Sequence, residues 1–241
     1  MPRVFVPAQL LDSGRVTLDR AASKHLIKVL RLQVGAEVRV FDGRGTEIEA
    51  LIVRASAAGV ELALGQRHRV SLPPVSITLL QSVPRGDRMD VIVQKTTELG
   101  VTRIIPVLSA CGIVKPPPGK TRRWRIIAQE AARQSGRADV PDVADPVALD
   151  VALAGAAAAG GTRMLLWEEE RALPLRQVLA KLPALPVTLL IGPEGGFSAE
   201  EVKSAQVQGF QAVGLGPRIL RVETAALVAV ALTQSAVGGL D

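Results

Sequence analysis

The sequence predicts an α/β protein with two domains, a small β-barrel-like domain at residues 1–72 and a larger domain with a mostly parallel sheet at residues 73–241. Two observations lead to this prediction. Up to residue 72 the chain consists of short strand candidates separated by glycine-containing turns, with one helix among them. Beyond it, apolar segments of strand length alternate with helical segments, as in a parallel sheet with both faces covered by helices.

The N-terminal domain is expected to hold four strands and one helix. The helix has apolar Leu26 and Leu30 on one face and basic Lys24, Lys28 and Arg31 on the other. Residues 1–72 carry 11 Lys and Arg against 7 Asp and Glu, a net charge of +4 out of +6 for the whole chain. Scattered surface charge and an RNA-docking face both explain this excess. The expected strands are Arg15–Leu18, Glu37–Phe41, Glu47–Val53 and Val60–Leu64.

The C-terminal domain is expected to follow a linker at Leu72-Pro73-Pro74, because consecutive prolines stiffen the backbone. Pro106 is expected to weaken its strand, since proline donates no ladder hydrogen bond. The expected strands are Val75–Leu80, Arg103–Leu108, Arg163–Trp167, Val187–Ile191 and Ala212–Leu215. The expected helices are Arg88–Leu99, Arg122–Gln134, Val147–Ala158, Leu175–Lys181, the segment from Ser198 to Gly209, and Thr224–Val237.

The last two expected strands each end in a Gly-Pro pair, Gly192-Pro193 and Gly216-Pro217. Between them, Ser198 and Glu201 form an S-x-x-E capping box that begins a helix, and Gly209 is placed to end it. A strand, a helix and a second strand in this order indicate a βαβ unit with parallel strands. Both Gly-Pro loops are therefore expected at one edge of the sheet, where open α/β sheets bind ligands.

The amino-acid composition argues against several kinds of binding site. The 48% of hydrophobic residues can form a core, while 2% aromatics argue against nucleic-acid recognition by aromatic stacking. One cysteine, Cys111, excludes an internal disulfide and a cysteine-based metal cluster, and two histidines are too few for a histidine-rich one, so no metal is expected. The chain shows no signal peptide and no apolar run near the ~20 residues of a membrane span. We expect a cytoplasmic protein without a membrane partner.

The first Gly-Pro loop, Ile191–Gly196, precedes a helix N-terminus, whose free backbone N–H groups bind anions and polar ligands. A tight turn that needs glycine is the alternative interpretation. The loop lacks both the G-K-[ST] of a P-loop and the G-x-G-x-x-G of dinucleotide-binding folds. An ATP-dependent or nicotinamide-dependent enzyme is therefore disfavoured.

The second Gly-Pro loop places Arg218, Arg221 and Glu223 between an apolar strand and an apolar helix, with Ile219 and Leu220 available as walls of an apolar slot. The alternative is an ordinary surface loop in which Glu223 pairs with an arginine, which is worth ~0–1 kcal/mol. We favour the functional interpretation.

The roles of two further charged segments remain open. Glu168–Glu170 follow an expected strand and so lie near the same sheet edge, where one acid could hydrogen-bond a ribose or an amino group. The basic residues between Lys120 and Arg137 are either a solvated helix face or a contact with RNA or a second subunit.

Several segments resemble one known family. They are LLIGPEGGFSAEEV, LGPRILRVETAALVAV, RMDVIVQKTTELGV and EAARQSGR, with VLRL and VFDGRG near the N-terminus. Over nearly the whole chain the sequence resembles the RsmE family of 16S rRNA uridine-N3 methyltransferases. The resemblance implies the SPOUT fold, whose C-terminal sheet carries a deep trefoil knot that holds S-adenosylmethionine. It also implies a PUA-like RNA-binding barrel at the N-terminus, a homodimer, and as substrate a uridine in the decoding region of 16S rRNA within the 30S subunit.

The resemblance also implies site residues, with the cofactor bound mainly by backbone groups of the two loops. The implied cofactor contacts are Leu166, Leu190, Gly192, Pro193, Glu194, Gly195, Gly196, Leu215, Gly216, Ile219, Leu220 and Thr224. The implied RNA contacts are Arg3, Lys24, Lys28, Arg31, Arg122, Arg133 and Arg137.

Uracil N3 carries a proton and is a poor nucleophile until that proton leaves. We expect Arg221 and Arg218 to donate hydrogen bonds to O2 or O4 of the base, and Glu223 or Glu194 to orient the arginine or receive the proton. Two alternatives stay open: a SPOUT methyltransferase that acts on tRNA or another rRNA base, and a non-catalytic ribosome-assembly factor that uses the knot as a binding platform.

Overall fold

The computed structural model describes residues 1–56, 59–72, 75–112, 116–182 and 186–240, so Pro73 and Pro74 of the expected linker lie outside the described residues. The chain forms two compact units. Unit 1 contains residues 1–72 and 129–140, and unit 2 contains the described residues of 73–128 and 141–241. Helix α3 (Lys120–Ser135) contributes to both, which a division at residue 72 does not anticipate.

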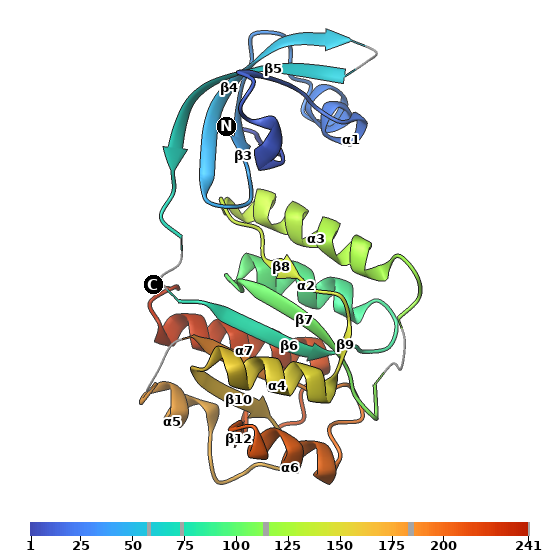
Figure 1. Cartoon of the computed structure of the whole chain (residues 1–241), viewed down its shortest axis with the longest axis vertical. Helices are drawn as coiled ribbons and strands as arrows, with labels where there is room; N and C mark the ends of the chain where they lie inside the picture. Colours follow the sequence, from blue (N-terminus) through green and yellow to red (C-terminus); the bar gives the residue numbers. More distant parts are fainter. Residues whose placement is uncertain (57–58, 73–74, 113–115, 183–185, 241) are drawn as a thin grey trace. The chain divides into compact units, whose positions relative to one another are not determined.

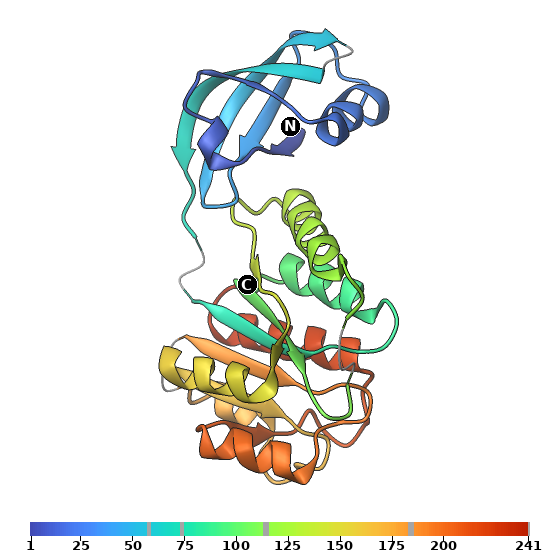
Figure 2. The same cartoon turned by 45° about the vertical axis from the view of Figure 1, so that its right-hand side comes forward.

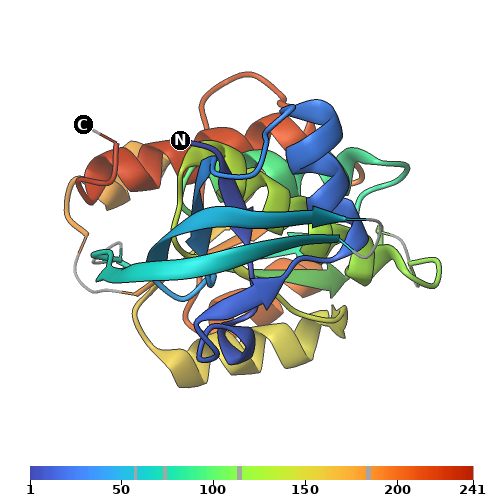
Figure 3. The same ribbon diagram turned by 90° about the horizontal axis from the view of Figure 1, so that it is seen from above.

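Unit 1 is built on a five-stranded sheet in the order β1-β3-β4-β5-β2. Its long strands β4 and β5 run side by side as an antiparallel pair (Figure 3). Leu26, Val38, Ile48 and Ile52 lie in a core with no exposed surface. The strands are β1 (Arg3–Phe5), β2 (Arg15–Thr17), β3 (Glu37–Phe41), β4 (Thr46–Ser56) and β5 (Gly59–Arg69), and a 3-10 helix η1 spans Ala8–Leu10.

The helix of unit 1 begins at Asp19, whose carboxylate accepts a hydrogen bond from the Ala22 N–H at 2.7 Å. Helix α1 (Arg20–Lys24) continues as one π-helical turn, η2 (His25–Val29). Arg31 follows with φ +56°, a conformation that non-glycine residues seldom adopt.

Unit 2 is built on a parallel sheet in the order β12-β10-β11-β6-β7-β8, with the short β9 also paired to β7. The expected parallel βαβ unit is confirmed, although β10 lies between its two strands. Ser198 and Glu201 form the capping box, and Gly209 follows the helix with φ +78°. The strands are β6 (Ile77–Ser82), β7 (Arg103–Leu108), β8 (Asp142–Val143), β9 (Val147–Ala148), β10 (Thr162–Leu166), β11 (Val187–Ile191) and β12 (Gln211–Val213).

Pro106 does not disrupt β7, contrary to expectation. On one side β7 pairs with β6 through residues 103–107, and Pro106 is in register with Gln81. On the other side it pairs with β8 at residues 103–104 and with β9 at residues 107–108. Pro106 falls in the gap between these two short strands, where no ladder donor is required.

The helices of unit 2 cover both faces of the sheet. Helices α4 and α6 pack with Leu80, Leu165 and Leu190 on one face. Helices α2 and α7 contact each other, and α7 also contacts β11, on the opposite side (Figures 1 and 2). No helix in the described part of the chain is long and apolar enough to cross a membrane. The helices are α2 (Arg88–Glu98), α4 (Leu149–Ala159), α5 (Leu175–Leu179), α6 (Ala199–Val207) and α7 (Val222–Ala236).

Candidate functional site

A cavity of about 610 Å³ lies where strands β10, β11 and β12 of unit 2 end. It is lined by both Gly-Pro loops, by the strand ends at Leu166, Ile191 and Val213, and by the first residues of α2 and α7. The volume is within the ~300–1,000 Å³ that is typical of small-molecule sites. The two loops therefore share one ligand-sized space, as the βαβ unit predicts.

The first Gly-Pro loop is tightly packed. Gly196 has φ +70°, which favours glycine, and a Cβ there would lie 2.1 Å from Glu168 Oε1, so the Glu168 side chain would have to move. A Cβ at Gly192 would lie 3.2 Å from the ring of Phe197, and one at Gly195 would lie 3.0 Å from Cys111 Cβ. The backbone of this loop thus forms one wall of the cavity, and the side chains of Phe197 and Cys111 pack against it.

The capping box of α6 adds to this support. Glu201 Oε2 accepts a hydrogen bond from the Ser198 N–H at 2.9 Å, and its Oε1 accepts one from the Ala110 N–H at 2.8 Å. Hydrogen bonds from the Glu200 backbone and the Ser198 side chain lower the pKa of Glu200 at the same helix end. The segment at Ala110 and Cys111 is therefore fixed against the first loop.

An arginine that the sequence interpretation missed binds the carboxylate of this loop. Arg88 Nη1 donates to Glu194 Oε1 at 2.6 Å, and the same oxygen accepts from the Arg85 N–H at 3.0 Å. Arg88 Nε also lies 3.8 Å from Glu223 Oε2 at the start of α7. Arg88 precedes this loop by about a hundred positions, and local patterns carry no signal for such a pair.

The second Gly-Pro loop is open. Gly216 has φ +98°, and a Cβ there would meet nothing within 4 Å. Ile219 is 84% exposed, and Arg218 and Arg221 are exposed without an ion pair to any described residue. The alternative that one of these arginines pairs with Glu223 is not what the structure shows, because Glu223 faces Arg88.

Most of the implied cofactor residues line the cavity, as do the three candidate catalytic residues. Leu190 and Thr224 do not. Leu190 alternates with Ile191 along β11 and so points to the opposite face, into the core with α4 and α6. Those that line it are Leu166, Gly192, Pro193, Glu194, Gly195, Gly196, Leu215, Gly216, Ile219 and Leu220, with Arg218, Arg221 and Glu223.

Besides Arg88, the cavity includes Trp167 and Glu168. Glu168 belongs to the acidic run for which the sequence left a ribose or amino contact open. It is exposed, and no hydrogen bond or ion pair joins it to another described residue. No group of three or more potential metal ligands occurs among the described residues.

The implied RNA-binding residues divide into two groups. Lys24, Lys28, Arg31 and Arg122 are exposed. The guanidinium groups of the other three are largely buried and paired within unit 1. Arg3 pairs with Glu47 at 2.6 Å, Arg133 with Glu130 at 2.9 Å, and Arg137 with Asp139.

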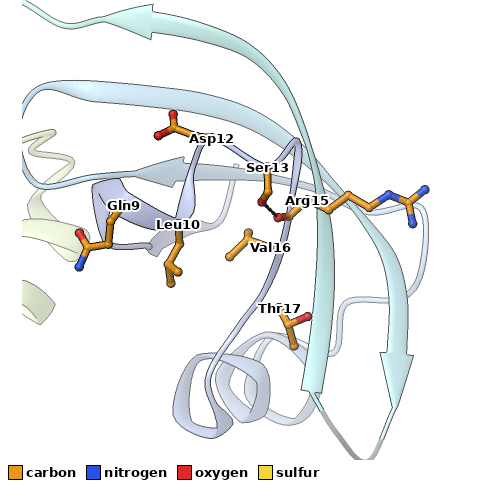
Figure 4. A pocket seen from close by; sticks show the side chains of 7 residues that line it. All are labelled: Gln9, Leu10, Asp12, Ser13, Arg15, Val16 and Thr17. Carbon is orange, nitrogen blue, oxygen red and sulfur yellow. Dashed lines mark hydrogen bonds between the residues drawn. The ribbon is translucent and has the colours of Figure 1, made fainter.

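A second hollow, of about 520 Å³, lies in unit 1 between η1 and β2 (Figure 4). Leu10 and Val16 lie beside it, while the Arg15 side chain extends away (Figure 4) and pairs with Glu61 at 3.3 Å. The two charged residues that line it are already paired, Arg15 with Glu61 and Asp12 with Arg67, so we place no reaction in it.

Comparison with known proteins gives family matches for both parts of the chain. The family described as an RNA methyltransferase domain matches residues 71–234, and the family described as an RNA methyltransferase PUA domain matches residues 18–64.

Ribosomal RNA small subunit methyltransferase E of Synechocystis is 35% identical over 95% of this chain and 75% of its own length. The protein of the same name from Bacillus subtilis is 31% identical over 95% of this chain and 94% of its own length. The crystal structure of ribosomal RNA small subunit methyltransferase E from Neisseria gonorrhoeae, bound to S-adenosylmethionine, superposes with a TM-score of 0.88 at 36% identity, covering 98% of this chain and 97% of that one.

Proposed function

The chain belongs to the ribosomal RNA small subunit methyltransferase E family, and on that premise we propose that it methylates N3 of a specific uridine in the decoding region of 16S rRNA, with S-adenosylmethionine as methyl donor. The observation that carries the proposal is the cavity shared by the two Gly-Pro loops at the ends of β10, β11 and β12. It offers a ligand-sized space with backbone on one side and, on the other, Arg218 and Arg221, which pair with no carboxylate of the described residues.

The residues present fit this cofactor. S-adenosylmethionine supplies a methyl group bound to a positively charged sulfur. Backbone groups from Gly192 to Gly196 would hold it without side-chain obstruction, and Leu166 and Leu220 offer apolar contacts for its ring. The carboxylate of Glu168, which has no partner among the described residues, is available to its hydroxyl or amino groups.

Arg221 and Arg218 would act on the base. Both line the cavity, both are exposed, and neither is neutralised by a carboxylate of the described chain. Hydrogen bonds from guanidinium groups to O2 or O4 stabilise the uracil anion, so N3 loses its proton more easily and its lone pair becomes available. The two candidate carboxylates, Glu194 and Glu223, both lie beside Arg88 instead of beside these arginines.

Transfer of labelled methyl to undermethylated 30S subunits, followed by mapping of the nucleotide, tests the proposal. Arg221→Ala is expected to lower kcat by about 100-fold, the effect of losing one donor to a developing charge, with little change in cofactor affinity. Arg176→Ala is a matched control, because Arg176 is exposed on α5 and does not line the cavity. Methylation of a tRNA or of a different rRNA base would contradict the assigned substrate, and turnover of the Arg221 variant near wild type would contradict the assigned role.

The proposal includes a trefoil-knotted fold of unit 2. In its support, the chain after β10 runs beside the chain that leaves β12, with a parallel bridge between Pro174 and Gly214. The Gly214 N–H donates to Leu173 O at 3.0 Å, and the Leu175 N–H donates to Gly214 O at 2.9 Å. A Cβ at Gly214 would lie 2.3 Å from Glu170 O, so the two segments touch backbone to backbone.

The proposal also includes a PUA-like barrel in unit 1, a homodimer, and action on the 30S subunit in the cytoplasm. The exposed Lys24, Lys28 and Arg31 of unit 1 and Arg122 of α3 are the proposed RNA contacts. We leave out Arg3, Arg133 and Arg137 because carboxylates of the chain already neutralise them. Binding through phosphates should weaken steeply with added salt, and light scattering should give twice the mass of one chain.

A further inference from the structure

Arg88 is the one cation that faces carboxylates from both Gly-Pro segments within the described part of the cavity. It contacts Glu194 of the first loop at 2.6 Å and approaches Glu223, at the start of α7 behind the second loop, to 3.8 Å. Its Nη1 also donates to Arg85 O at 3.1 Å, which fixes the guanidinium at the start of α2. A single side chain thus spans the two loops.

The two halves of this link differ. The Arg88–Glu194 half is a short, charge-assisted hydrogen bond, strengthened by the Arg85 N–H on the same oxygen. The Arg88–Glu223 half is an ion pair without a hydrogen bond, and Glu223 Oε2 is buried and has no hydrogen-bond partner. A buried carboxylate oxygen without a hydrogen-bond donor is unfavourable. A movement that brings a donor to Glu223 Oε2 is therefore favoured.

From these contacts we infer that Arg88 is a positioning residue that couples the two loops when the cofactor binds. The first loop holds Arg88 in place, and a shift of the second loop and the start of α7 toward the cofactor brings Glu223 Oε2 within hydrogen-bond distance of Arg88 Nε. The hydrogen bond completed in this way stabilises the bound state relative to the free state. Arg88 therefore contributes to cofactor affinity without having to contact the base.

This inference rests on the proposed function and deepens it, and calorimetry with S-adenosylmethionine separates the two. Binding by the wild-type protein is measured first; its absence contradicts the proposed cofactor. If the wild type binds, Arg88→Ala is expected to weaken affinity about 10-fold, the equivalent of one hydrogen bond to a charged group. Lys95→Ala is the matched control, because Lys95 is similarly exposed on the same helix and pairs with Glu98 away from the cavity.

A double-mutant cycle gives the readout that a merely structural role would not give. Glu223→Gln should weaken affinity in the wild-type background and add almost nothing in the Arg88→Ala background, since the two side chains form one link. Arg88→Lys should restore part of the affinity because it keeps the charge but loses the planar fork. The loss of cofactor affinity in Arg88→Ala should appear as a raised KM for S-adenosylmethionine.

Additive effects of the two substitutions would overturn the coupling. An Arg88→Ala affinity equal to that of the Lys95 control would overturn the positioning role altogether. Thermal melting of each variant checks that the fold is retained, and Glu194→Gln offers a second way to release Arg88 if Arg88→Ala does not fold.

Discussion

The two Gly-Pro loops of this chain share a sequence signature but differ in how tightly they are packed. In the first, Gly192, Pro193 and Gly196 are buried, and a Cβ added at Gly192, Gly195 or Gly196 would lie within 3.2 Å of a neighbouring side chain. In the second, residues 216–219 are exposed, and the Gly216 carbonyl accepts a hydrogen bond from Arg171 at 3.3 Å. The first loop is therefore confined by its neighbours, whereas the second has room to adjust to a ligand.

Gly196→Ala should give the largest effect on this contrast. The new Cβ would lie 2.1 Å from Glu168 Oε1 at a backbone φ of +70°. The new Cβ would displace the Glu168 carboxylate, a proposed cofactor contact, and the backbone strain adds to this loss. Binding of S-adenosylmethionine should therefore weaken by about 100-fold in calorimetry.

The matched variant in the second loop is Gly216→Ala. It carries the backbone strain of φ +98° without any contact within 4 Å. A loss of about 10-fold or less is expected. Equal losses for the two glycines would show that the loops are equally rigid and would remove the contrast.

Ile219→Ser should have a smaller effect. Ile219 lines the cavity yet is 84% exposed, so its apolar surface is buried only when a ligand is bound. Cofactor affinity should fall about 5-fold while the melting temperature stays unchanged. Val207→Ser is the control, because Val207 is an exposed apolar residue of α6 that does not line the cavity, and this change should leave affinity unaltered.

The smallest expected effect is that of removing the Lys120–Asp87 ion pair beside the start of α2. Lys120 hydrogen-bonds Asp87 at 2.6 Å and lowers the pKa of that carboxyl below its usual 3.8. Because the folded-state pKa is depressed, the contribution is present above pH ~4 and is lost as the pH falls through the folded-state value. Lys120→Ala should lower the melting temperature by at most about 2 °C at pH 7.

In acid the Lys120→Ala difference should disappear, as followed by thermal melts from pH 7 to pH 2.5. A difference that persists unchanged at pH 2.5 would show that Lys120 acts through packing instead of charge. Cofactor affinity at pH 7 should not change, because neither side chain lines the cavity.

Sequence patterns predicted the structure correctly where it depends on residues close together in the chain. The Ser198–Glu201 box, the Gly209 stop and the parallel direction of β11 and β12 were all predictable. Pro106 was misjudged because its tolerance depends on a gap between β8 and β9, which are too short to recognise in sequence.

Prediction of the site also failed where it depends on contacts between residues far apart in the sequence. Its glycines, Leu166 and the loop arginines were identified through motifs, and these do line one cavity. Arg88 was not identified, because its significance arises only when α2 meets loops that lie about a hundred residues further along the chain. Leu190 was expected to contact the cofactor because the family resemblance implies it, but it does not line the cavity, and strand alternation turns its side chain into the core.

The span of the cavity's lining has a consequence for the protein's own synthesis. The lining begins at Arg88 and is complete only with Ala225, in the first turn of α7. A nascent chain that has been translated only as far as β12 therefore lacks the wall that residues 215–225 contribute. The complete pocket can form only after the first turn of α7 has left the ribosome.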